Sequence, residues 1–302
     1  MACSALAVLL AVTSASVSGR PGEKAPRGPS PGQPAAASKR QQRDNLASRD
    51  FQLNINATQV VEKMARQSNQ VAVAVAAIRA NTKCGRSRAP RPVVPFRGRA
   101  DLAYQLERDF PHGRGCELGV QRGVFSAQIL ERWTSCARYH LVDLWSQQPN
   151  YKDKANVNNN EQQQRYEETM LAVKPYKLRG TEVTSCRNYT NACAALWARP
   201  ESLDFIYVDA RHDYLGALQD MLLWWPLLRC GGIMAGHDYV TQEEVSRMSP
   251  KVKQDWTKNF DGTVDETRRV LKGAADDFSS FINRQLTISY QEGAWHTWAV
   301  RK

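Results

Sequence analysis

From Ala100 to the end of the chain, short apolar segments alternate with segments of helical periodicity. The predicted strands are Gly115–Leu118, Tyr139–Leu144, Tyr176–Arg179, Leu203–Val208 and Ile233–Ala235, then a hairpin of Gln285–Tyr290 and Trp295–Val300 that turns at Glu292-Gly293. The predicted helices are Ala100–Phe110, Val124–Trp133, Glu161–Val173, Asn191–Ala198, Leu215–Leu228 and Gly262–Asn283. This alternation predicts an α/β fold with a doubly wound, mostly parallel sheet. Ligands bind beyond the carboxyl ends of such strands, so chemistry is expected in the residues that follow each strand.

The segment before this region has a different composition. Residues 58–99 are predicted to hold a helix, Thr58–Ala80, and a Pro- and Arg-rich loop, whereas residues 20–57 lack the apolar surface to fold and predict a disordered basic stem. Of the formal net charge of +11, +4 falls on Met1–Asp50 and +6 on Asn81–Ala100, which leaves +1 for the rest. The domain over residues 100–302 is therefore nearly neutral, and we expect no nucleic-acid partner.

The first 19 residues are typical of a signal peptide. The apolar run Ala5–Val12 is followed by small residues up to Gly19, which predicts entry into the secretory pathway. No Lys or Arg precedes the run, so a plastid transit peptide and a retained short anchor are alternatives. No run approaches the ~20 apolar residues of a membrane span.

Cysteines and glycosylation acceptors fit the secretory prediction. Removing the leader would leave an even set of cysteines, either paired in up to three disulfides or present as buried thiols: Cys84, Cys116, Cys136, Cys186, Cys193 and Cys230. Asn56 and Asn188 lie in Asn-x-Ser/Thr acceptors and predict a glycoprotein, although such tripeptides are also frequent by chance.

The first two strand ends carry features of a nucleoside site. Glu117 precedes a turn at Gly119, where a missing side chain allows close approach to a ligand, and Gly123 opens the next helix. Asp143 ends the second strand, where a carboxylate can accept both ribose hydroxyls of a nucleoside. Trp145, two residues later, either covers the adenosine or packs in the core.

The next two strand ends carry candidate reacting groups. The buried strand Leu203–Val208 stops at Asp209, with His212 on the following loop, and the strand Ile233–Ala235 is followed by His237 and Asp238. Neighbouring strand ends would bring the two carboxylates together. Two carboxylates and an imidazole suit a divalent cation such as Mg²⁺, with Asp209 and Asp238 as ligands, or a metal-free base with an orienting acid. A purely structural polar cluster is the third alternative.

Together these motifs resemble the class I S-adenosylmethionine-dependent methyltransferases. The similarity is carried by Glu-Leu-Gly-Val-x-x-Gly-x-Phe-Ser, Val-Asp-Leu-Trp, Phe-Ile-Tyr-Val-Asp-Ala-x-His-Asp-Tyr and Gly-Gly-x-x-x-x-His-Asp-Tyr. It is closest to the small-molecule and sugar O-methyltransferase-like branch with a His-Asp-Tyr loop, and it covers roughly Ala100–Lys302. The resemblance implies a Rossmann-like, seven-stranded sheet whose C-terminal hairpin supplies the one antiparallel strand.

The resemblance also implies roles for residues. Cofactor contacts are implied for Glu117, Gly119, Gly123 and Asp143, with Thr181 and Glu182 near the adenine, and reacting groups for Asp209, His212, His237 and Asp238. Some metal-dependent relatives carry two consecutive acids where this chain has His237-Asp238, so the cation is open. The polar segments Tyr151–Asn160 and Val240–Asp261 are expected to act as lids or substrate loops.

The implied activity is methylation of a hydroxyl on a small molecule or glycan. Methyl transfer from a sulfonium needs alignment of donor and acceptor and removal of a proton. Two other classes are alternatives: a non-catalytic binding or assembly protein that keeps the fold, and a dinucleotide-dependent α/β enzyme, which the missing third glycine disfavours. The acceptor and the oligomeric state do not follow from the sequence.

Overall fold

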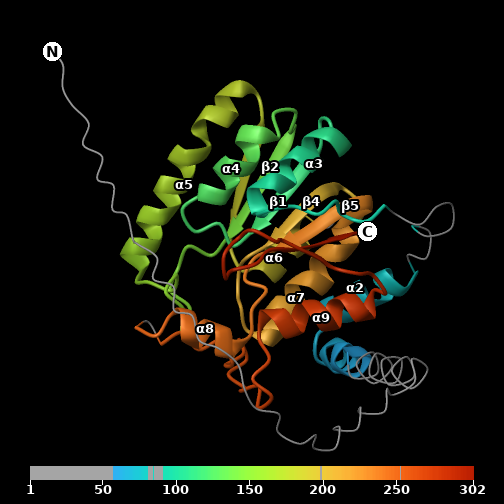
Figure 1. Ribbon diagram of the computed structural model, residues 1–302, viewed down its shortest axis with the longest axis vertical. Helices are drawn as coiled ribbons and strands as arrows, with labels where there is room; N and C mark the ends of the chain where they lie inside the picture. Colours follow the sequence, from blue (N-terminus) through green and yellow to red (C-terminus); the bar gives the residue numbers. More distant parts are fainter. Residues whose placement is uncertain (1–56, 81–83, 85–90, 198, 252) are drawn as a thin grey trace, which may run out of the picture. The chain divides into compact units, whose positions relative to one another are not determined.

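The computed structural model describes residues 57–80, 84, 91–197, 199–251 and 253–302 (Figure 1). The predicted leader, residues 20–56 of the predicted stem with the acceptor Asn56, and residues 81–83 and 85–90 of the Arg-rich loop lie outside the described residues.

A seven-stranded sheet has the order β3-β2-β1-β4-β5-β7-β6. Its strands are β1 (Arg114–Leu118), β2 (Arg138–Asp143), β3 (Glu182–Arg187), β4 (Leu203–Val208), β5 (Leu228–Gly236), β6 (Thr287–Ile288) and β7 (Trp298–Arg301). The first five strands are parallel, and β7 runs antiparallel to both β5 and β6. The predicted α/β fold and the single antiparallel strand are therefore confirmed. The strand order reverses between β1 and β4, which is the switch point where a ligand is expected.

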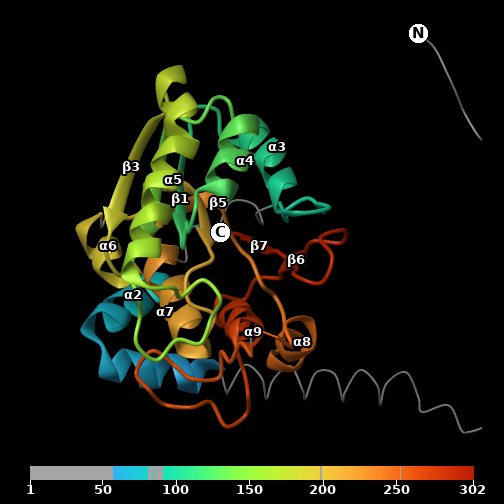
Figure 2. The ribbon, with the colours of Figure 1, turned by 90° about the vertical axis from the view of Figure 1, so that its left-hand side faces the viewer.

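Helices cover both faces of the sheet (Figures 1 and 2). One face carries α3 (Leu102–Asp109), α4 (Val124–Arg132) and α5 (Asn159–Arg179); the other carries α2 (Asn69–Ala80), α6 (Thr190–Leu196), α7 (Tyr214–Trp224) and α9 (Leu271–Phe281). Strand β4 is buried on both sides because its side chains alternate: Phe205 and Tyr207 join the first layer, Ile206 and Val208 the second. Short helices η2 (Arg99–Asp101), η3 (Trp225–Leu227) and α8 (Gln242–Met248) complete the domain.

The predicted strand Tyr176–Arg179 is wrong, because α5 continues through Pro175 to Arg179. The helix ends at Gly180, whose φ of 110° is a left-handed conformation that favours glycine. The third strand starts only at Glu182. The predicted strand is the last turn of this helix, so the predicted adenine contact fell at the start of β3 and not after its end.

Two predicted helices also have different boundaries. Residues 57–67 and α2 are separate helices that meet at Ser68, whose hydroxyl accepts the N–H of Val71 at 3.4 Å and so caps the second helix. The predicted helix Gly262–Asn283 begins only at Leu271. Before it, the side chains of Asp261 and Asp265 accept backbone N–H groups two residues later, which favours turns over helix.

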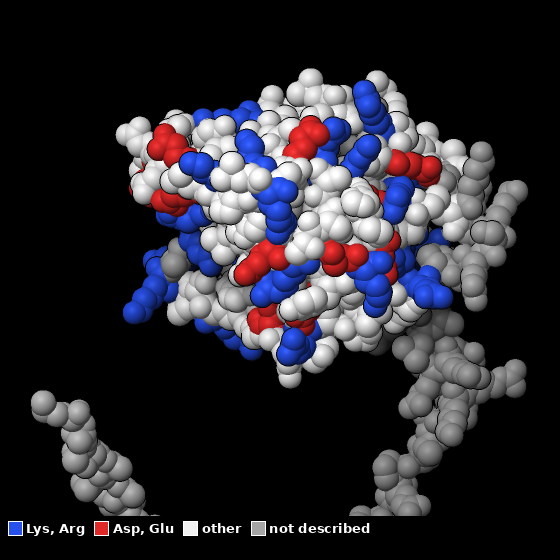
Figure 3. Space-filling view, turned by 90° about the horizontal axis from the view of Figure 1, so that it is seen from above, with Lys and Arg blue, Asp and Glu red and all other residues white. Residues whose placement is uncertain are grey.

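The cysteines form two disulfides, Cys84–Cys230 and Cys186–Cys193. Cys116 and Cys136 are free and buried, so the upper limit of three bridges is not reached. Of the helices in the described part of the chain, none has the length and apolarity needed to cross a bilayer. On the face drawn in Figure 3, basic and acidic side chains are interspersed.

Candidate active site

A cavity of about 600 Å³ runs along the carboxyl ends of β1 to β5. This volume is in the range of small-molecule and cofactor sites. Most of the predicted site residues line it: Glu117, Gly119, Asp143, Asp209, His212, His237 and Asp238. The parallel sheet therefore brings four separate sequence motifs to one edge.

Position 119 requires a glycine, because the turn after β1 crosses the turn after β4 there in close contact. Its φ is 82°, and a Cβ added there would overlap the backbone carbonyl of Asp209. The strands hold this crossing in place, since the N–H of Asp209 donates to the carbonyl of Leu118 at 2.7 Å. The turn that opens the cavity and the acid that ends β4 thus depend on the same glycine.

Asp143 organises the loop after β1. Its carboxylate accepts three backbone N–H groups, from Val120 at 2.8 Å, Gln121 at 2.9 Å and Trp145 at 2.8 Å. A carboxylate has roughly four acceptor positions, so most of its capacity is used by the protein. Asp143 lies where a ribose contact was predicted, and it also holds the shape of the cavity wall.

Gly123 and Trp145 are not cavity-lining residues. Gly123 has a φ of 73°, and a Cβ there would press on Thr169 of α5, so this glycine serves helix packing. The Trp145 ring is 1% exposed, stands edge-on to Tyr166, and donates its N–H to the carbonyl of Gln121. Of the two alternatives for Trp145, the structure shows core packing.

The adenine contacts predicted for Thr181 and Glu182 are wrong. Both residues lie at the amino end of β3, and Glu182 pairs there with Arg138 at the start of β2. This is the edge of the sheet opposite the cavity. Four other residues form the cavity wall after β3. They were not predicted as site residues because the third strand was predicted too early in the chain: Asn188, Tyr189, Thr190 and Asn191.

His212 is the centre of a polar cluster at the ends of β4 and β5. Its Nε2 lies 3.3 Å from Asp209 and 3.1 Å from Asp238, so one imidazole joins the ends of β4 and β5. His237 lies beside it, with Nδ1 2.8 Å from Asp238. Asp238 has a φ of 55°, which is uncommon for a residue with a side chain and is typical of strained functional sites.

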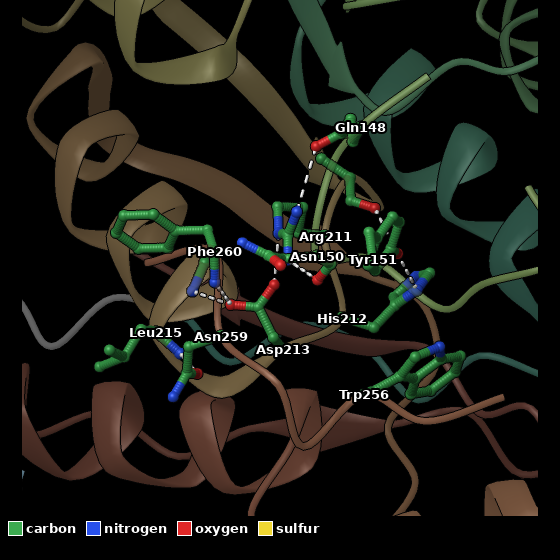
Figure 4. A network of polar contacts seen from close by, with 12 residues as sticks. Gln148, Asn150, Tyr151, Arg211, His212, Asp213, Leu215, Trp256, Asn259 and Phe260 are labelled. Carbon is green, nitrogen blue, oxygen red and sulfur yellow. Dashed lines mark hydrogen bonds and ion pairs between the residues drawn. The ribbon is translucent and has the colours of Figure 1, made fainter. Parts of the chain in front are cut away.

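Further side chains contact His212 from the opposite side of its ring, at Nδ1 and at the ring face (Figure 4). Its Nδ1 lies 2.8 Å from the hydroxyl of Tyr151 and 3.6 Å from Asp153, and its ring packs against the tilted ring of Trp256, with the centroids 4.3 Å apart. The indole N–H of Trp256 donates to Asp153 at 2.7 Å. Both predicted loops, Tyr151–Asn160 and Val240–Asp261, thus contribute to one cover over the imidazole.

Asp213 anchors this cover. Its carboxylate caps α7 by accepting the N–H of Gly216 at 2.9 Å, accepts the N–H of Phe260 at 3.2 Å, and pairs with Arg211. Arg211 also donates to the carbonyl of Asn150 at 3.3 Å (Figure 4). Three loops are therefore tied to a buried carboxylate that stands next to His212 in sequence.

The cluster favours a charged imidazole. Burial lowers the pKa of His212, but Tyr151 and the carboxylates of Asp153, Asp209 and Asp238 outweigh it and raise the pKa well above its usual value. Burial raises the pKa of Asp238, yet the two histidines lower it overall. The resting site is thus an imidazolium held among carboxylates.

The same side chains fit a divalent cation. Ligand atoms of Asp209, His212 and Asp238 all lie within 4.8 Å of one another. Oxygen donors with one imidazole suit Mg²⁺, Mn²⁺ and similar ions. A cation there would take over the charge that the imidazolium supplies.

Two residues without a sequence signal complete the site. Arg99, in η2, lines the cavity 3.8 Å from Asp209, and Glu292, from the β6–β7 turn, lies 3.9 Å from both Arg99 and His237. Neither stands at the end of a parallel strand, so the rule that located the other residues did not point to them.

A family model described as a methyltransferase domain matches residues 116–239, a stretch that begins within β1, extends just beyond β5 and includes all four motifs. This part of the chain is therefore similar to a methyltransferase domain. No curated protein matches the sequence significantly.

Solved structures similar to this chain include O-methyltransferases. One from Bacillus cereus, in complex with SAH, is 14% identical, with 76% of this chain and 91% of that one covered and a TM-score of 0.42. TomG from Streptomyces achromogenes is 14% identical, with 78% and 90% covered and a TM-score of 0.42. A putative caffeoyl-CoA O-methyltransferase from Staphylococcus aureus is 11% identical, with 82% and 100% covered and a TM-score of 0.41.

Proposed function

We propose that the protein transfers the methyl group of S-adenosylmethionine to a hydroxyl of a small molecule or sugar. One observation carries this proposal: a single cavity is lined both by the nucleoside-site residues Glu117, Gly119 and Asp143 and by the cluster of Asp209, His212 and Asp238. The first set suits the nucleoside of the donor and the second suits an acceptor hydroxyl. Donor and acceptor would meet at the switch point between β1 and β4.

The proposed catalytic base is His212. Asp209 and Asp238 orient the acceptor hydroxyl, and His212, once it has lost its own proton, accepts the proton that the hydroxyl releases. Because its pKa is raised, neutral His212 is a minor form at neutral pH but a stronger base. His237 supports Asp238 through their 2.8 Å contact.

A divalent cation is the alternative arrangement of the same site. Asp209, His212 and Asp238 would hold it, and it would polarise the acceptor oxygen as a Lewis acid. Metal analysis of the purified protein, with titration of Mg²⁺ and Mn²⁺ after chelation, tests this arrangement. Full activity in a metal-free sample assigns His212 as base, whereas activity that requires added cation assigns it as ligand.

The acceptor end of the cavity supports a small, ring-shaped acceptor. Trp256 and Trp295 have ring centroids 6.0 Å apart and line the same wall as Gln254 and Lys154. Flat aromatic faces beside polar groups suit a sugar or an aromatic alcohol. A volume of about 600 Å³ for donor and acceptor together favours a small molecule or one terminal glycan residue.

We further propose that the protein enters the secretory pathway. The two disulfides support this, since disulfides persist in oxidising compartments. Asn188 is exposed but also lines the cavity, so a glycan on it would compete with the ligand. Mass spectrometry of protein from a secreting host tests leader removal and occupancy of both acceptors.

The test of function has two steps. Calorimetry with S-adenosylhomocysteine measures whether the donor site binds, and transfer of isotope-labelled methyl to a panel of sugars and phenols identifies the acceptor. Binding with transfer to a hydroxyl supports the proposal. Absence of S-adenosylhomocysteine binding in the folded protein would contradict it and favour the non-catalytic alternative.

A further inference from the structure

We infer that Arg99 binds the α-carboxylate of the methyl donor, while Glu117 faces the α-ammonium of the same amino-acid group. This inference rests on the proposed function, because it concerns how the donor is held. It places a residue from outside the strand-end motifs in the donor site.

Arg99 is held in place by the C-terminal hairpin. Its backbone N–H donates to Glu292 at 2.9 Å, and Glu292 also accepts the N–H of Thr297 at 3.1 Å. The side chain then extends over the Phe125 ring, at 5.5 Å from its centroid, to the cavity beside Asp209. The guanidinium is therefore positioned by the fold before a ligand arrives.

The guanidinium keeps hydrogen-bond donors for an anion. Its ion pairs with Asp209 and Glu292 are 3.8 and 3.9 Å long, which is longer than a hydrogen bond. The Arg99 side chain is 29% exposed. Burial opposes its charge, but Tyr207, Asp209 and Glu292 raise its pKa, so it stays cationic. A planar guanidinium in this setting suits bidentate binding of a carboxylate.

Glu117 supplies the complementary acid. Its Oε2 accepts the hydroxyls of Ser126 at 2.5 Å and Tyr139 at 3.3 Å, while the residue also lines the cavity. Burial raises its pKa to about 8, with Ser126 acting against burial. A buried acid of this kind ionises readily only when a cation arrives. The α-ammonium of the donor is such a cation.

The combination points to an amino acid rather than to a simple anion. Arg99 and Glu117 line the same cavity and lie close enough for the charge of Arg99 to lower the pKa of Glu117. A phosphate or a sulfate would be opposed by Asp209 and would bring no cation to Glu117. A zwitterion places one charge opposite each partner.

The test compares two ligands that differ only at this group. S-adenosylhomocysteine carries the amino-acid end, and 5′-methylthioadenosine has the same nucleoside and thioether without it. Calorimetry is run on the wild type, on Arg99→Gln and Arg99→Lys, and on the control Arg108→Gln. Arg108 is exposed and pairs only with the adjacent Asp109 among the described residues.

We expect Arg99→Gln to weaken S-adenosylhomocysteine about 30- to 100-fold and methylthioadenosine less than about twofold, as lost charge-assisted pairing predicts. Arg99→Lys should recover part of the lost affinity, because lysine keeps the positive charge but lacks the two parallel N–H donors of the guanidinium. The control should match the wild type. An equal effect on both ligands, or no effect on S-adenosylhomocysteine, overturns the role of Arg99. Failure of the wild type to bind either ligand contradicts the proposed function instead.

Discussion

Nε2 of His212 and Oδ2 of Asp238 lie 3.1 Å apart, although they belong to loops after different strands. The contact exists because β4 and β5 are parallel neighbours, with Val208 opposite Gly236. Both loops therefore leave the sheet at the same edge. The proton on His212 is shared between carboxylates from both strands, and this makes it the group whose titration reports most directly on the site.

Replacing Asp238 with Asn should change the pH dependence of methyl transfer. In the wild type, activity should rise with pH through the raised pKa of His212, because only the neutral imidazole accepts a proton. Removing one carboxylate lowers that pKa, so the rising limb should shift to lower pH while the plateau falls about 10- to 100-fold. Rates of methyl transfer measured from pH 6 to 10 for both proteins check this. If the rise in rate occurs at the same pH in the variant and the wild type, His212 is not the base.

Replacing Gly119 with Ala should abolish the fold or cost about 4 kcal/mol or more of unfolding free energy. The added methyl would overlap the Asp209 carbonyl. Gly231 is the matched control: its φ is 81° against 82° for Gly119, and nothing lies within 4 Å of an added Cβ. Gly231→Ala should cost only about 1–2 kcal/mol, the price of the left-handed backbone. Urea unfolding of both variants measures the two losses of unfolding free energy. Equal losses would show that the contact between Gly119 and the Asp209 carbonyl does not contribute to stability.

Donor binding should strengthen between pH 6 and 8 and release a proton below pH 8. Burial raises the pKa of Glu117 to about 8, and a bound α-ammonium favours its ionised form. Calorimetry of S-adenosylhomocysteine in two buffers of different ionisation enthalpy measures the proton. Glu117→Gln should bind more weakly with no such release, and unchanged release in that variant would point to another group.

Glu117 should also make the free protein less stable as pH rises. Its pKa in the folded protein is above the unfolded value near 4.5, so its contribution to stability is complete below about pH 4.5 and is lost as pH rises through about 8. The Glu117→Gln variant, compared with the wild type by thermal unfolding from pH 5 to 8, should show a flatter dependence. If Tm depends on pH in the same way in the variant and the wild type, Glu117 is not a buried neutral acid in the folded protein.

Trp256→Phe should lower kcat/KM about fivefold and leave S-adenosylhomocysteine affinity unchanged. Phe keeps an aromatic ring over His212, at 4.3 Å in the wild type, but loses the 2.7 Å hydrogen bond to Asp153. A hydrogen bond to a charged group contributes about 1.5–3 kcal/mol to stability, and only part of this should affect turnover, because Asp153 lies 3.6 Å from His212. Trp256→Ala, which also removes the ring, should lose about tenfold more. Equal activity of both variants would show that the cover plays no part in turnover.

The disulfide Cys186–Cys193 should matter for donor binding, because it brackets the cavity wall of residues 188–191. Replacing both cysteines with serine should weaken S-adenosylhomocysteine about three- to tenfold by loosening that wall. The same change at Cys84 and Cys230 should lower Tm without affecting affinity. Calorimetry and thermal unfolding of the two double variants separate these effects.

Much of the fold followed from local pattern. The apolar run Leu203–Val208 became β4 with the predicted bounds, and the strand ends at Asp143, Asp209 and Asp238 met at one cavity as expected. Parallel strands connected by helices leave little freedom, because each carboxyl end must open on the same edge. The failures were local too: the strand predicted at Tyr176–Arg179 is the end of α5, so the third strand and the cavity wall after it were predicted too early in the chain.

By itself the sequence determined the sheet, its functional edge and the residue types that reach that edge, since hydrophobic period and glycine position act over a few residues. Only the tertiary structure decided that Arg99 and Glu292 join the site, that Trp145 packs away from it, and that Trp256 covers His212. These contacts join segments far apart in the chain. They depend on how loops pack over a finished sheet, and no local pattern encodes that packing.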